Sequence, residues 1–103
     1  MKLYHVTDSA EAILRDGFRD GEGNYGLATT WLIGIFVSDE PLSVNEGAFG
    51  EQVLEVTLPD DAELHEYELI EYFKNYREWC VPAALLNGRQ VRLLSHDEVE
   101  ALR

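Results

Sequence analysis

The chain has 103 residues, of which 20 are acidic and 8 are Lys or Arg, so its formal net charge is −12. The length fits one domain, residues 1–103, and 46% hydrophobic residues indicate a globular chain. The negative charge disfavours nonspecific binding to nucleic acid, because the phosphate backbone is repelled. No apolar run reaches the roughly 18 residues that span a bilayer. With a single cysteine, Cys80, and no signal-peptide pattern, we expect a cytoplasmic protein.

The chain begins with a strand pattern followed by a helix pattern. Residues 3–6 predict a short strand, and residues 9–16 predict a helix. Thr7 or Asp8 is expected to cap this helix, with Glu11 as the reciprocal partner of a capping box.

The middle of the chain alternates between glycine-rich and apolar segments. Residues 19–26 predict a polar loop, and the β-branched and aromatic residues 33–38 predict a strand. Pro41 suits the first turn of a short helix between residues 39 and 50. Residues 51–59 alternate between two faces, which is typical of a strand.

The last third predicts short elements of both kinds. Residues 60–76 fit a strand or a helix equally well and stay unassigned. The expected elements that follow are a strand at 78–81, a turn of helix or a bend at 82–86, a strand within 88–95, and a helix at 96–103 with Ser95 and Glu98 as a capping box. The fold class is therefore α+β, with a small, antiparallel-rich sheet and few short helices.

Three stretches place a noteworthy residue in or beside a strand that otherwise looks buried. They are "LYHVT" with His5, "GIFVSDEP" with Phe36 and "YREWCVP" with Glu78. Taken alone, a strand histidine and a strand phenylalanine are usual core residues. A Glu beside an Arg is usually a surface ion pair.

The order and spacing of these motifs resemble the ADP-ribosyltransferase-like family of the diphtheria-toxin and poly(ADP-ribose)-polymerase type, whose site is described as His, Tyr, Glu. The resemblance runs from Tyr4 to about Leu94 and implies a split β-sheet that binds NAD as a substrate. Two positions depart from the pattern. Phe36 stands where the family typically has Tyr, and Val6 stands where the polymerases often have Gly.

The resemblance implies a role for each matching residue. Glu78 would stabilise the oxocarbenium-like transition state of nicotinamide–ribose cleavage. His5, Val6 and Thr7 would bind and orient the dinucleotide, with the Val6 backbone holding the nicotinamide amide. Phe36 would stack on the nicotinamide ring. By approximate spacing, Ser43 would bond the amide and Phe49 would be a second aromatic.

The expected activity is mono-ADP-ribosyl transfer to an unidentified acceptor, which could be a protein, or to water. The chain is too short for the additional regions of the polymerases. An alternative is a catalytically inactive acidic binding protein of the immunity or antitoxin type on the same fold, which the net charge of −12 favours. RNA 2′-phosphotransferase is a third reading, weakened by the few basic residues. The His and Cys spacing matches no metal-binding motif, so no metal is expected.

Overall fold

The computed structural model describes residues 1–25, 30–43, 50–70 and 74–103. In chain order the elements are β1 (Lys2–Thr7), α1 (Ala10–Asp16), β2 (Gly21–Tyr25), β3 (Thr30–Ser38), β4 (Gln52–Thr57), the 3-10 turn η2 (His65–Tyr67), β5 (Glu78–Val81), α2 (Ala83–Leu86), β6 (Gln90–Leu93) and α3 (His96–Leu102). Among the described residues, no helix is both long and apolar enough to cross a bilayer.

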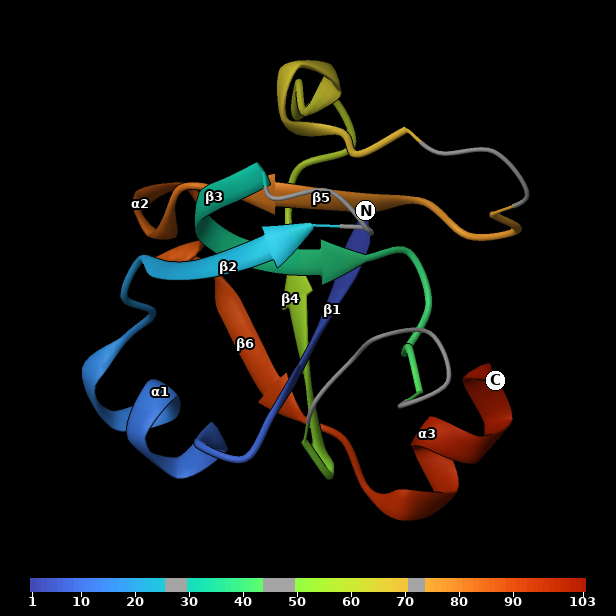
Figure 1. The fold of residues 1–103 in the computed structure, drawn as a ribbon. Helices are drawn as coiled ribbons and strands as arrows, with labels where there is room; N and C mark the ends of the chain where they lie inside the picture. Colours follow the sequence, from blue (N-terminus) through green and yellow to red (C-terminus); the bar gives the residue numbers. More distant parts are fainter. Residues whose placement is uncertain (26–29, 44–49, 71–73) are drawn as a thin grey trace.

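The strands form one sheet whose pairings are all antiparallel. The order along the sheet is β2-β3-β1-β4-β6, and β5 pairs with β3. Figure 1 shows two groups of strands at a steep angle to each other, with β2, β3 and β5 in one group and β1, β4 and β6 in the other. The groups meet where Tyr4 of β1 pairs with Ser38 of β3. The predicted α+β class, antiparallel pairing and short helices are confirmed.

Alternation along the strands gives the sheet two different faces. Leu3, Leu54 and Val56 lie on what we call the core face, and each is at most 1% exposed. The buried apolar side chains that pack there are Leu3, Ala10, Phe18, Ile35, Val37, Leu54, Val56, Leu58, Leu64, Trp79, Val81, Ala83 and Leu86. On the opposite face, here the second face, a smaller cluster contains Tyr4, Val53, Leu94 and Val99. The alternation predicted for residues 51–59 is therefore confirmed.

One expected loop is a strand. The glycine content of residues 19–26 predicts a polar loop, but Gly21–Tyr25 forms β2 and pairs residue by residue with β3. The prediction is wrong because glycine-rich segments carry little side-chain periodicity, whereas backbone pairing needs none. Strand β3 is also longer than predicted, since it begins at Thr30.

The first helix is capped differently from the expectation. Its N-cap is Ser9, which makes no side-chain cap, so the predicted capping box with Glu11 is absent. Thr7 Oγ1 accepts a hydrogen bond from the Ser9 N–H at 2.9 Å, and Asp8 Oδ1 accepts from the Glu51 N–H at 2.9 Å. The two predicted caps therefore bond elsewhere: Thr7 accepts from the residue before α1, and Asp8 accepts from the residue before β4.

The other predicted helix features have mixed outcomes. The capping box of Ser95 and Glu98 is present at the start of α3, as expected. The strand at 78–81, the helical turn within 82–86 and the strand within 88–95 are also confirmed. Pro41 lies in a segment without regular structure rather than in a helix, and residues 44–49 of the expected helix lie outside the described residues.

Gly34 marks the point where β3 leaves β2 and approaches β5. Its φ is 150°, and a Cβ at this position would lie 2.7 Å from the carbonyl oxygen of Val81. We expect Gly34→Ala to lower the free energy of unfolding by about 3 kcal/mol, through backbone strain and displacement of β5. Urea denaturation measures this.

Gly88→Ala is the matched control for that substitution. Gly88 also has a positive φ, 83°, but a Cβ added there would meet no atom within 4 Å. Its variant should lose only about 1 kcal/mol, the strain of a left-handed backbone. Equal losses in the two variants would show that the contact with β5 does not restrict position 34.

Candidate functional site

Strand register determines which predicted site residues share a face. Tyr4 pairs with Ser38, and Ser38 pairs with Glu78. Because cross-strand partners point to the same side of a sheet, Glu78 lies on the second face. His5 follows Tyr4 in β1, so its side chain points to the core face. The structure therefore does not bring the His5 and Glu78 side chains to one face.

The imidazole of His5 sits at the junction of the two strand groups. Its Nδ1 is 2.8 Å from the carbonyl oxygen of Phe36, and its ring meets the ring of Phe18 edge-on with 5.6 Å between centroids. Burial lowers the pKa of His5, while the hydrogen bond to Phe36 opposes that shift. The neutral ring therefore donates Nδ1–H to Phe36 across the gap between β1 and β3.

A group of half-buried side chains lies on the second face beside this junction. Phe36 pairs with Cys80 in the register of β3 and β5, two residues away from the Ser38–Glu78 pair. Val6 of β1 points to the same side. We call Val6, Phe36, Glu78 and Cys80 the Glu78 face. Each is partly exposed, whereas Val37 and Val81 on the core face are fully buried.

Glu78 does not stand alone on this face. Its Oε1 is 3.0 Å from Lys74 Nζ, and both side chains are nearly buried, with exposed fractions of 14% and 11%. Its backbone carbonyl accepts the Leu69 N–H at 2.9 Å. The carboxylate is thus paired with an adjacent cation in a largely dry setting, where each charge depends on the other for compensation.

Arg77 lies directly before β5, and its carboxylate partner is Glu68 rather than Glu78. Its guanidinium makes a bidentate contact with Glu68, at 2.7 and 2.9 Å, and lies 4.9 Å from the centroid of the Trp79 ring. The pair lowers the pKa of Glu68. Asp39 exchanges hydrogen bonds with the backbone of residue 77. The structure therefore assigns Arg77 to a carboxylate partner, Glu68.

The thiol of Cys80 faces acidic neighbours. Burial raises its pKa, and the carboxylates of Asp20 and Glu78 raise it further. The thiol form is therefore favoured over the nucleophilic thiolate.

The remaining predicted residues lie away from Glu78 or outside the described part. Thr7 is on the core-face side of β1, where its hydroxyl accepts from Ser9. Ser43 lines a cleft of about 470 Å³ on the second face, and Phe49 lies outside the described residues. The other residues that line this cleft are Gly50, Glu51, Val53, Leu94, His96, Val99, Glu100 and Arg103.

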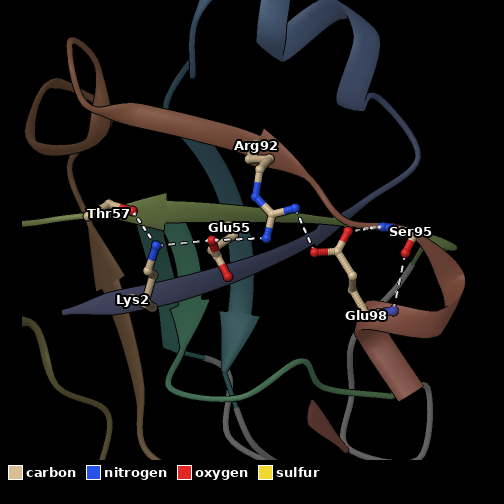
Figure 2. A network of polar contacts seen from close by, with 6 residues as sticks. All are labelled: Lys2, Glu55, Thr57, Arg92, Ser95 and Glu98. Atoms are coloured by element: carbon tan, nitrogen blue, oxygen red, sulfur yellow. Dashed lines mark hydrogen bonds and ion pairs between the residues drawn. The ribbon is translucent and has the colours of Figure 1, made fainter. Parts of the chain in front are cut away.

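A second buried carboxylate, Glu55, was not singled out from the sequence. It is 8% exposed and accepts from Lys2 at 3.3 Å and from Arg92 at 3.5 Å. Figure 2 shows how Arg92 also reaches Glu98 of the α3 capping box, so that the network links β1, β4, β6 and α3. The alternation of residues 51–59 was the available signal, because it placed Glu55 beside Val53. Its contacts give it a structural role.

Comparisons with known proteins identify no relative. No protein-family profile, no curated protein and no solved structure matches the chain. Within the described ranges, no group of three or more His, Cys, Asp or Glu side chains is arranged to hold a metal ion.

The partly buried His5, whose pKa is lowered by desolvation, should give the protein a distinctive pH dependence. Because its pKa is lower in the folded state, the unfolded chain binds the proton more tightly. Its stabilising contribution is fully present above the unfolded pKa of about 6.5 and is lost as the pH falls through the folded pKa. We expect the free energy of unfolding to decrease on acidification through this window, and to decrease less in His5→Gln.

Urea denaturation at a series of pH values tests this expectation. His65→Gln is the control, since it makes the same substitution at an exposed position on η2. Glu68 and Glu98, whose pKa values are lowered, lose their contributions at more acidic pH and do so in all three proteins. Parallel profiles for wild type and His5→Gln would contradict the assigned state of His5.

Proposed function

We propose that this domain binds NAD on the Glu78 face and cleaves the nicotinamide–ribose bond, as a mono-ADP-ribosyltransferase or NAD hydrolase. The observation that carries the proposal is the placement of Val6, Phe36 and Glu78, from three separate motifs, on one half-buried face. Such a face offers an aromatic surface and a carboxylate side by side. A flat cationic ring attached to a ribose requires both.

In the proposed reaction the bond between ribose C1′ and the nicotinamide nitrogen breaks. Nicotinamide leaves as a neutral molecule with the bonding electrons, and positive charge develops on the ribose. Glu78 stabilises this oxocarbenium-like centre electrostatically. A nucleophile on the acceptor, or water, then bonds to C1′ and releases its proton.

The roles of the other residues follow from their positions. Phe36 stacks on the nicotinamide ring. Val6 contributes backbone groups from the part of β1 that follows Tyr4, the residue through which β1 pairs with β3. His5 acts from the opposite face as a positioning residue. Its hydrogen bond to the Phe36 carbonyl, 2.8 Å long, fixes the strand that carries the stacking ring. This replaces the direct ribose contact that the family resemblance implies for His5.

Release of nicotinamide from NAD by the purified protein tests the proposal, with and without cell lysate as a source of acceptor. Glu78→Gln should reduce the rate by about 100-fold or more, because removing one group that stabilises transition-state charge typically has this effect. Glu55→Gln is the matched control, since Glu55 is also a buried, cation-paired carboxylate but supports α3, and it should keep the wild-type rate. Turnover that is unchanged in Glu78→Gln would refute the mechanism.

A second candidate is an acidic binding protein of the immunity or antitoxin type. The specific observation in its favour is a run of exposed carboxylates that extends from the end of β4 into η2. It is formed by Asp61, Glu63 and Glu66, together with Asp60, which pairs with the N-terminal ammonium. These charges suit a basic partner. If the wild type neither binds nor cleaves NAD, and a basic partner binds both wild type and Glu78→Gln, this candidate replaces the first.

A further inference from the structure

We propose that Glu78, the Leu69 carbonyl and the Tyr76 ring form a binding site for an organic cation, which the chain's own Lys74 occupies. Lys74 Nζ lies 3.0 Å from Glu78 Oε1 and 3.4 Å from the Leu69 carbonyl oxygen. It also lies 5.3 Å from the centroid of the Tyr76 ring. Each of these groups attracts an organic cation. The carboxylate and the carbonyl act through charge and dipole, and accept hydrogen bonds from an ammonium, and the aromatic face acts through its π electrons.

This arrangement differs from a surface ion pair. The Lys74 and Glu78 side chains are 11% and 14% exposed, whereas those of Arg15 and Asp16 are 66% and 42% exposed. Lys74 lies outside any helix, so its spacing of four residues from Glu78 does not reflect helical geometry. The Leu69 N–H donates to the Glu78 carbonyl. This bond holds residue 69 against β5, so that the Leu69 carbonyl is the second acceptor beside the Lys74 ammonium. The acceptors are therefore organised around the position of the cation.

Lys74 lies outside the strands and helices, so displacing its side chain breaks no pairing of the sheet. Lys74 then acts as a tethered competitor for any external cation that needs Glu78. The identity of the natural ligand rests on the proposed function, in which the nicotinamide-ribosyl group supplies the cation. Removal of the Lys74 charge should strengthen the binding of a pyridinium cation by roughly tenfold.

Thermal unfolding of Lys74→Ala with and without ethylammonium tests the site directly. The truncation opens space for the amine beside Glu78, so ethylammonium at about ten times its dissociation constant should raise Tm by roughly 5–10 °C. Ethanol and sodium chloride at the same concentration should not, because neither supplies an organic cation. Lys2→Ala is the matched control, since its partner Glu55 is also buried but Lys2 itself is half exposed. Its Tm should not respond to ethylammonium.

Calorimetry with N-methylpyridinium gives a second test that does not require the truncated variant to be stable. Lys74→Met keeps an unbranched apolar side chain, one atom shorter, and removes the charge. It should bind the probe about tenfold more tightly than the wild type does. Equal or weaker binding by Lys74→Met, or a Tm rise of the same size in Lys2→Ala, would overturn the proposal. Neither readout depends on NAD turnover. The cation site can therefore be confirmed when the proposed reaction is refuted, and it can be refuted when the reaction is confirmed.

Discussion

The hydrogen bond from His5 to the Phe36 carbonyl is the interaction on which the rest of this structure depends. Strands β1 and β4 pair along six residues, but β1 and β3 pair through Tyr4 and Ser38 before they separate. The imidazole bridges the two strands beyond that point. A partly buried histidine therefore joins the two strand groups, and desolvation disfavours its charged form there.

The junction also explains why the two faces of the sheet differ. On the core face, α1, α2 and the η2 region supply the apolar residues that cover the strands, and the central side chains are fully buried. On the second face, α3 packs over Tyr4 and Val53 and is held by the network of Glu55 and Arg92. Phe36 and Glu78 lie beside that packed region, half-buried, where an aromatic ring and a carboxylate can meet a ligand.

Local features were predictable from the sequence. The alternation of β4, the strand at residues 78–81 and the capping box of α3 depend on neighbours within a few positions, and each is confirmed. Strand β2 was missed because its glycines carry no periodic side-chain signal, so its assignment depends on pairing with β3. The predicted helix cap at Thr7 or Asp8 is wrong for a similar reason. The Asp8 carboxylate accepts from the N–H of Glu51, which is distant in the sequence.

The candidate site was only partly predictable for reasons of register. Phe36 and Glu78 come from separate motifs and share one face because β3 and β5 pair directly. Adjacent positions in a strand point to opposite faces, so the side chains of His5 and Val6 do not share one. The pairing of β1 with β3 decides which of the two lies on the side of Glu78. Lys74 was overlooked within the unassigned residues 60–76. The sequence does contain a feature that indicates the ion pair: a lysine stands four residues before Glu78 in a chain with 20 acidic residues.

Backbone NMR of the wild type titrated with NAD tests the central claim most directly, because it reports which face of the sheet a ligand contacts. The account predicts that the largest shift changes fall on Val6, Phe36, Glu78 and Cys80, together with Lys74. Leu58 and Leu86, which are buried in the core cluster, should change little. Changes concentrated on the core face, or at the α3 cleft without the Glu78 face, would contradict it.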